Sequence, residues 1–198
     1  EVAINALAED TECFCDDVVE PGTKDYKSKF IELNKKEFDV FMANGQSPTT
    51  VAAMATQMRE LGLSQPIVST DAADSVTLGH MARDAVEGLR ALSVPSLSAD
   101  DPNSTAFINT FDGKYRTPEV GYFFAALSYE ATKLLLNAIG EVGTSGEAIR
   151  DALYAHPGYK SLVGTISFDE YGDVKGIPFA LKEFQSGELV EVERIPLE

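Results

Sequence analysis

Hydrophobic and polar residues follow a repeating pattern through the first half of the chain. Apolar residues spaced three and four apart predict helices, over residues 1–8, 26–36, 49–61 and 76–86. Short apolar runs between them predict strands, over residues 12–19, 38–43, 66–69 and 87–92. Regular alternation of helix and strand is typical of a parallel sheet that is covered by helices, so the pattern predicts an α/β fold.

The pattern changes after residue 93. Residues 94–102 are rich in Pro, Ser and Asp, as in a linker or crossover. Three helical patterns then follow without a strand among them, over residues 104–115, 119–139 and 146–154. Helices this apolar need a sheet or other helices to cover them. The last part returns to strands, with one over 164–168 and a hairpin over 179–184 and 189–195.

The end of the 66–69 strand carries a candidate site. Ser69 and Thr70 are followed at once by Asp71, where the strand gives way to a loop. Ligands of open α/β sheets bind outside the carboxyl ends of the strands, so Asp71 is placed to meet a ligand cation such as an amino group. The alternative is that Asp71 only caps the next helix. Asp74, directly before Ser75, is better placed for that task.

Composition narrows the possible partners. The 198 residues carry a net charge of −16, which argues against binding nucleic acid or an anionic membrane surface, because both need basic patches. No run of apolar residues is long enough to span a bilayer. The chain begins with Glu1 rather than Met, and we expect it to be a mature, trimmed or partial polypeptide.

Sequence motifs for catalysis, cofactors and metals are absent. The chain has no phosphate-binding Gly-rich loop, no dinucleotide fingerprint and no nucleophile elbow, so we expect no cofactor. His80 and His156 are the only histidines, too few for a convincing catalytic triad or metal site. Cys13 and Cys15 would share one face of an extended strand at the upper limit of disulfide reach, so we expect two packed thiols.

Several segments, in the same order along the chain, resemble the type I periplasmic binding proteins, and within them the branched-chain amino acid (Leu/Ile/Val) binding family of ABC transporters. They are Glu20-Pro21-Gly22-Thr23-Lys24-Asp25-Tyr26, the strand 38–43 with the helix end Arg59-Glu60-Leu61-Gly62-Leu63, Ala85-Val86-Glu87-Gly88-Leu89, Ala106-Phe107 through Tyr115 and Pro118 to Tyr129-Glu130-Ala131, and the segment 164–173. The last reads Gly-Thr-Ile-Ser-Phe-Asp-Glu-Tyr-Gly-Asp.

The resemblance implies a two-lobed protein of which this chain is the C-terminal part. Residues 1–93 and 164–198 resemble the C-terminal lobe, a three-layer αβα domain with a parallel sheet. Residues 94–163 resemble helices that return to cover the N-terminal lobe, which is itself missing. This reading explains the strandless, apolar helices.

The family's site residues carry over to five positions. Asp71 matches the acidic residue that binds the ligand's α-ammonium group, where a charge-assisted hydrogen bond in a closed cleft is strong. Gln46 and Ser47 fall where the family places a ligand contact, although the loop is one residue longer and lacks the usual Tyr. Phe124 matches an aromatic residue that lines the pocket from the other lobe, and Tyr122 is its rival. The alternatives are turn and cap chemistry for Gln46 and Ser47, and plain helix core for the aromatic residues.

The function that the resemblance implies is solute binding by hinge closure around an amino acid, followed by recognition by an ABC permease, in the periplasm or outside the cell. Other interpretations are a ligand-sensing receptor domain of the same fold and an unrelated α/β enzyme. We expect the chain alone to bind amino acids weakly or not at all. We also expect the apolar helix over 119–139 to be covered, either by a second copy in a homodimer or by rearranged elements of the chain.

Overall fold

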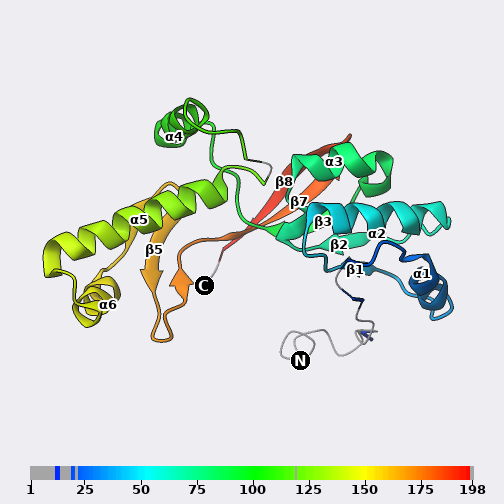
Figure 1. Ribbon diagram of the computed structural model, residues 1–198, viewed down its shortest axis with the longest axis horizontal. Helices are drawn as coiled ribbons and strands as arrows, with labels where there is room; N and C mark the ends of the chain where they lie inside the picture. Colours follow the sequence, from blue (N-terminus) through cyan, green and yellow to red (C-terminus); the bar gives the residue numbers. More distant parts are fainter. Residues whose placement is uncertain (1–11, 14–18, 21, 119, 197–198) are drawn as a thin grey trace.

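The computed structural model describes residues 12–13, 19–20, 22–118 and 120–196, which form two packed parts (Figure 1). The sheet part contains α1 (Lys27–Asn34), β1 (Phe41–Ala43), α2 (Pro48–Glu60), β2 (Ile67–Ser69), η2 (Asp71–Ala73), α3 (Val76–Ala82), η3 (Arg83–Val86), β3 (Arg90–Ser93), β7 (Phe179–Gln185) and β8 (Glu188–Ile195). The helical part contains α4 (Pro102–Asp112), α5 (Phe123–Val142), α6 (Gly146–Ala155), β4 (Tyr159–Ser161), β5 (Gly164–Phe168) and β6 (Val174–Lys175). The two parts are joined after β3 and before β7 (Figure 1).

The five-stranded sheet has the order β1-β2-β3-β7-β8. β1, β2 and β3 are parallel, as the alternating pattern predicts, whereas β7 is antiparallel to β3 and β8 is antiparallel to β7. The predicted hairpin at the end of the chain is therefore confirmed, and it extends the parallel strands into a mixed sheet. Because β1 and β2 are parallel neighbours, the loops that follow them leave the sheet at the same edge.

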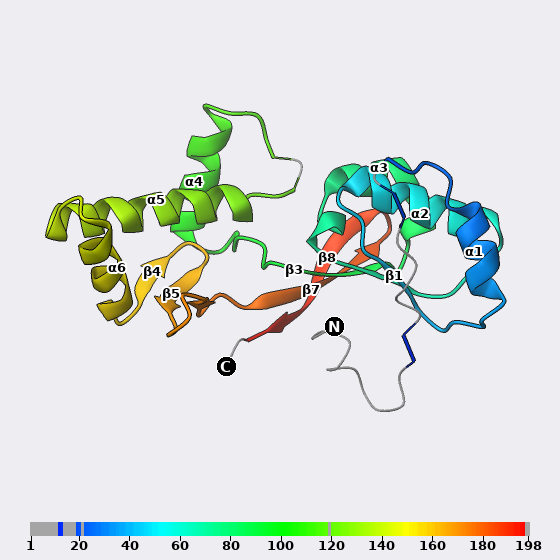
Figure 2. The same cartoon turned by 60° about the horizontal axis from the view of Figure 1, so that its bottom comes forward.

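Helices α1, α2 and α3 lie on one side of this sheet (Figure 2). The spacing of three and four that predicts α2 is the spacing of its buried face, which includes Val51, Met54 and Met58. Gly62, with φ of +75°, follows the helix in a conformation that favours glycine. The predicted helix over 76–86 is interrupted, because Arg83 adopts a φ of +47° and the chain continues as the 3₁₀ turn η3.

The helical part has a smaller core of its own, formed by Phe123, Ala126, Leu134, Val163 and Ile166. Its three-stranded sheet has the order β4-β5-β6. The strand over 164–168 is therefore present, but it packs with this core and not with the five-stranded sheet, where we expected it. The reason is local pairing: β5 forms an antiparallel ladder with β4, a strand of three residues that the sequence pattern did not predict.

Some predictions fall on residues outside the described ranges. The helix over 1–8 is one of them, and only residues 12, 13 and 19 of the strand over 12–19 are described. Cys13 is disulfide-bonded, which corrects the expectation of two free thiols. That expectation assumed an extended strand, and Cys13 carries no strand assignment. Within the described part of the chain, no helix has the length and apolar character needed to cross a membrane.

Candidate functional site

Two loops meet at the carboxyl edge of the parallel strands. Ala43 at the end of β1 is the register partner of Ser69 at the end of β2. The buried Ser69 hydroxyl donates a hydrogen bond of 2.7 Å to the Ala43 carbonyl oxygen. This bond holds the two strand ends together, so the loops 44–47 and 70–75 begin side by side.

The loop after β1 is tightly constrained. A Cβ atom at Gly45 would lie 2.9 Å from Val51 Cγ2 and 3.2 Å from Thr50 Cγ2, so a larger residue does not fit without movement. Ser47 caps α2, since its hydroxyl oxygen accepts a hydrogen bond of 3.3 Å from the Thr50 amide, and Pro48 occupies the first turn as predicted. The alternative interpretation of Ser47 as a helix-capping residue is thus confirmed.

The loop after β2 presents Asp71 at the start of the 3₁₀ turn η2. The Ala73 amide donates to the Thr70 carbonyl oxygen at 3.0 Å, and the Asp74 amide donates to the Asp71 carbonyl oxygen at 2.9 Å. The Asp71 side chain is exposed. Its carboxylate has no hydrogen-bond or ion-pair partner among the residues that the structure describes, so it is available to a ligand.

Neither Asp71 nor Asp74 caps α3. That position belongs to Ser75, whose hydroxyl oxygen accepts a hydrogen bond of 3.2 Å from the Thr77 amide. Asp74 is buried, and one of its carboxylate oxygens accepts hydrogen bonds from Lys182 Nζ at 2.6 Å and from the Ser93 hydroxyl at 2.7 Å. The expectation that Asp74 is the better placed cap of α3 is therefore wrong, because its side chain forms an ion pair with the buried Lys182 of β7.

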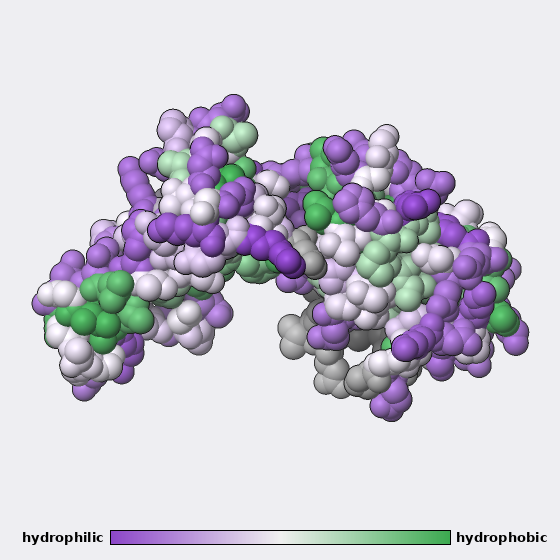
Figure 3. Space-filling view, turned by 45° about the horizontal axis from the view of Figure 1, so that its top comes forward, coloured by the Kyte–Doolittle hydropathy of each residue, from purple (hydrophilic) through white to green (hydrophobic). Residues whose placement is uncertain are grey.

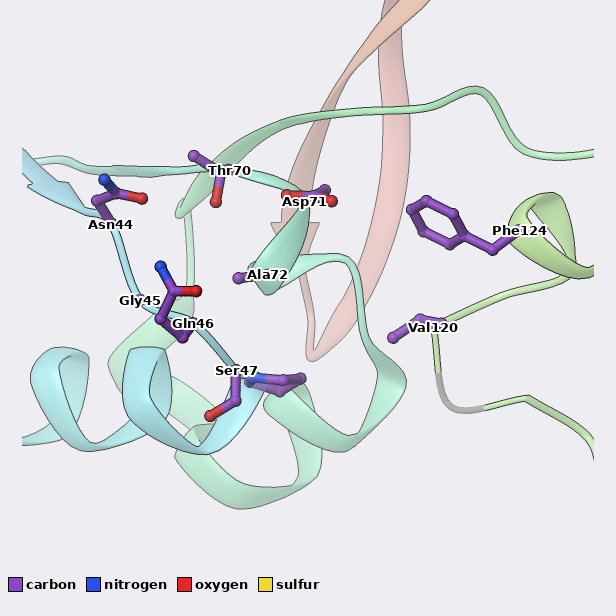
Figure 4. Close-up of a pocket in the computed structure, with 10 residues that line it drawn as sticks. Asn44, Gly45, Gln46, Ser47, Thr70, Asp71, Ala72, Val120 and Phe124 are labelled. Carbon is purple, nitrogen blue, oxygen red and sulfur yellow. The ribbon is translucent and has the colours of Figure 1, made fainter. Parts of the chain in front are cut away.

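An open pocket of about 440 Å³ lies over the two loops (Figure 4). Its lining comes from the sheet part and from the segment at the start of α5: Asn44, Gly45, Gln46, Ser47, Pro48, Thr70, Asp71, Ala72, Val120 and Phe124. In Figure 4 the Phe124 ring points toward Asp71 across the opening, with Val120 below it. The pocket therefore has a polar wall and an apolar wall.

Four of the five predicted site residues line this pocket: Asp71, Gln46, Ser47 and Phe124. Tyr122 does not line it. The Tyr122 hydroxyl donates a hydrogen bond of 2.7 Å to Asp112 Oδ2. This hydrogen bond to Asp112 raises the pKa of Tyr122 above its ordinary value.

Sequence reasoning did not select the other six lining residues, among them Asn44, Thr70 and Val120. A signal was present for the first two. Asn44 directly follows β1 and Thr70 directly follows β2, and the carboxyl ends of parallel strands are where ligands bind. Val120 gave no such signal, because its place in the pocket depends on how the segment before α5 returns to the sheet part.

The charge of the lining decides what the pocket can hold. Its described residues include one carboxylate, Asp71, and no Lys, Arg or His. An uncompensated carboxylate attracts a cation, and a charge-assisted hydrogen bond from an ammonium group is among the stronger hydrogen bonds in proteins. No cluster of His, Cys, Asp and Glu in the described ranges could hold a metal ion. The geometry therefore suits an organic cation with an apolar portion beside Phe124.

Comparison with known proteins shows which family the whole chain resembles. The family model of periplasmic binding proteins matches residues 8–177. A curated relative, the leucine-, isoleucine-, valine-, threonine- and alanine-binding protein of Pseudomonas aeruginosa, is 26% identical over 82% of this chain. That alignment covers 43% of the relative, so the chain spans about half the length of such proteins.

Solved structures agree on the fold. The leucine-binding protein LivK of Thermotoga maritima superposes with a TM-score of 0.77 at 24% identity, over 90% of this chain and 50% of that one. LivJ of Streptococcus pneumoniae, solved in complex with isoleucine, gives a TM-score of 0.71 at 22% identity, over 88% of this chain and 50% of that one. The similarity again extends over about half of each neighbour.

Proposed function

The chain belongs to the periplasmic binding protein family, and from that premise we propose that it is part of the solute-binding component of an ABC transporter. Its ligand is an amino acid of the branched-chain type, bound between two lobes in the periplasm or outside the cell. It catalyses no reaction, and a membrane permease is the partner of the intact protein. The sheet part belongs to one lobe and the helical part to the other.

One observation carries the proposal: the exposed Asp71 carboxylate has no partner in the described structure and stands opposite Phe124 across the pocket. The carboxylate binds the ligand's ammonium group, while Phe124 and Val120 contact its aliphatic side chain. A ligand without an ammonium group would leave Asp71 unpaired once the pocket closed, which is costly. The names of these relatives support the ligand class, because they bind leucine or isoleucine.

The remaining polar lining residues have subordinate parts in this proposal. Gln46 contributes an exposed amide that can contact the ligand, whereas the Ser47 hydroxyl is engaged in capping α2. No cationic side chain in the described lining can balance the ligand's carboxylate. We therefore expect the chain by itself to bind leucine only weakly, with a dissociation constant on the order of 1 mM or higher. Micromolar affinity in a calorimetric titration would contradict this expectation.

The experiment that tests Asp71 uses leucine and two of its fragments. Isopentylamine keeps the cation and loses the carboxylate, and 4-methylpentanoate does the reverse. In amide NMR titrations of the isotope-labelled chain, we expect leucine and isopentylamine to shift Thr70 and Ala72, and 4-methylpentanoate to leave them unchanged. Asp71→Asn should weaken isopentylamine binding roughly 10-fold or more, because a hydrogen bond to a charged group contributes about 1.5–3 kcal/mol.

Asp100→Asn is the matched control, since Asp100 is an exposed carboxylate outside the pocket. It changes the net charge by the same amount as Asp71→Asn and should leave the titration unchanged. Equal binding of isopentylamine and 4-methylpentanoate would contradict the proposal, and so would an Asp71→Asn chain that binds the amine as well as the original does.

The apolar helices bear on a second partner. Residues of α5 and α6 expose apolar side chains, among them Leu135, Leu136 and Tyr154, and a hydrophobic patch is visible over the far end of these helices (Figure 3). Exposed apolar patches commonly mark interaction sites. We propose that a second copy of the chain covers this patch. Light scattering should then show a dimer that Leu136→Lys dissociates. A monomer at all concentrations would count against the homodimer.

A further inference from the structure

Directly after the η2 turn, whose Asp71 and Ala72 line the pocket, lies a cluster of buried polar groups that ligand binding itself does not use. We define it as the Asp74 network: the Asp74 carboxylate, the Lys182 ammonium group and the Ser93 hydroxyl. Lys182 Nζ and Ser93 Oγ both donate to Asp74 Oδ2, at 2.6 Å and 2.7 Å. All three residues are buried, with exposed fractions of 7% for Asp74, 5% for Lys182 and 2% for Ser93.

Burying an ion pair in a protein core costs free energy of hydration. The loss of hydration for the two charges can exceed their attraction, so apolar residues of similar volume often give equal or better stability. Stability alone is therefore a weak reason for Asp74 and Lys182 to lie here. A directional link between fixed elements is something that apolar packing does not provide, because the hydrophobic effect has no preferred direction.

The elements that this link joins are informative. Asp74 directly follows η2, and its amide donates to the Asp71 carbonyl oxygen. Ser93 is the last residue of β3, after which the chain leaves the sheet part for α4. Lys182 lies on β7, the strand by which the chain returns from the helical part (Figure 1). One carboxylate thus ties the turn of Asp71 to both strands at which the chain crosses between the two parts.

We propose that Asp74, Ser93 and Lys182 are positioning residues. They fix the η2 turn to the two strands that connect the parts, so that the Asp71 carboxylate faces Phe124. This inference rests on the proposed function for the role of Asp71. The network touches no ligand. It acts by restricting the turn through the hydrogen bond between the Asp74 amide and the Asp71 carbonyl oxygen.

The decisive variant removes the link without leaving a buried charge. Asp74→Leu, Ser93→Ala and Lys182→Met together replace every partner with an apolar group, a change that is often neutral for stability. We expect the amides at positions 73 and 74 to exchange with solvent about 10-fold or more faster in the triple variant, relative to Met58 on the buried face of α2. Isopentylamine affinity, measured by NMR titration, should fall several-fold.

Arg90→Met with Glu183→Gln is the matched control. Arg90 and Glu183 form an ion pair of 2.6 Å between β3 and β7, the same strands that carry Ser93 and Lys182, but Arg90 is exposed. The control should leave the turn amides and the amine affinity unchanged. If the triple variant accelerates exchange at Met58 as much as at Ala73, the network is merely stabilising and the proposal fails.

A second set of variants covers the case in which the triple variant does not fold. Ser93→Ala alone keeps the ion pair and removes one hydrogen bond, and we expect about 3-fold faster exchange at the turn. Lys182→Arg keeps the positive charge, so the turn amides of that variant should retain most of their protection from exchange. Unchanged exchange at the turn in the Ser93→Ala chain would overturn the proposal.

Failure of this inference can be told apart from failure of the proposed function. If Asp71→Asn weakens amine binding while the triple variant changes neither turn exchange nor affinity, the positioning role is wrong and the ammonium site stands. If the triple variant loosens the turn while Asp71→Asn has no effect on the amine, the network does fix the turn but Asp71 is not the ammonium ligand.

Discussion

Among the described residues, each of the two parts buries one carboxylate, and the two parts satisfy it in different ways. In the sheet part, Asp74 is paired with Lys182, whose side chain is only 7% exposed. In the helical part, Glu130 is 2% exposed and accepts hydrogen bonds from the Leu162 amide at 3.4 Å, the Tyr159 hydroxyl at 3.2 Å and Lys133 Nζ at 3.0 Å. The Lys133 side chain is 42% exposed.

The difference separates two uses of a buried charge. Glu130 joins α5 to the β4–β5 hairpin mostly through neutral donors, and its cation stays in contact with water. Asp74 depends on a cation that has also been removed from water, so each charge of that pair needs the other. The sheet part should therefore respond strongly to the loss of its lysine, whereas the helical part should respond to the loss of its carboxylate.

The largest effect is expected from removing the buried cation. Lys182→Met keeps the apolar stem but leaves Asp74 as an uncompensated charge, which should lower the free energy of unfolding by about 3–5 kcal/mol. Lys133→Met removes a partly solvated cation and should cost only about 0–1 kcal/mol. Urea titrations followed by far-ultraviolet circular dichroism measure both. Equal losses in the two variants would erase the contrast between the parts.

Removing the carboxylate of the helical part should have an intermediate effect. Glu130→Ala leaves the Leu162 amide and the Tyr159 hydroxyl without their acceptor, and an unsatisfied buried donor costs about 1–3 kcal/mol. Glu130→Gln retains a carbonyl oxygen that can accept from Leu162, so its loss in urea titrations should be smaller. Identical losses for the two variants would mean that charge, and not hydrogen bonding, holds the hairpin to α5.

These contrasts also show how far the sequence can be interpreted alone. Local signals worked where the cause is local: Ser47 and Pro48 start α2, Gly62 follows it, and the strand-end position of Asp71 indicates the pocket. They failed where the cause is distant. The role of Asp74 depends on Lys182, which lies 108 residues away, and no pattern around Asp74 reveals that partner.

The aromatic candidates show a similar limit. Tyr122 and Phe124 lie two residues apart at the start of α5, so the helix rotation decides which one lines the pocket. The sequence gives the helix but not its rotation against the sheet part, which depends on packing with α4 and the β4–β5 hairpin. The strand β4 was missed for a related reason, since three residues are too few to show a period.

The residues that cap the helices also differ between the two parts. This difference predicts the smallest effect on stability. α2 and α3 are capped by the hydroxyls of Ser47 and Ser75, which do not titrate. α4 is capped by the Asp101 carboxylate, which accepts from the Ser104 hydroxyl at 2.7 Å and the Ser104 amide at 2.9 Å. These hydrogen bonds from Ser104 hold the pKa of Asp101 below its ordinary value.

Acid should therefore fray the start of α4 and leave the starts of α2 and α3 unchanged. Because the folded pKa of Asp101 lies below its unfolded value, its contribution is fully present above about pH 4 and is lost as the pH falls through the folded pKa. Amide exchange at Ser104, corrected for the intrinsic pH dependence, should accelerate over that window, while Thr50 and Thr77 keep their protection. Asp101→Asn, which caps without a charge, should remove the dependence on pH. An unchanged acid response in that variant would assign the fraying to another carboxylate of the helical part.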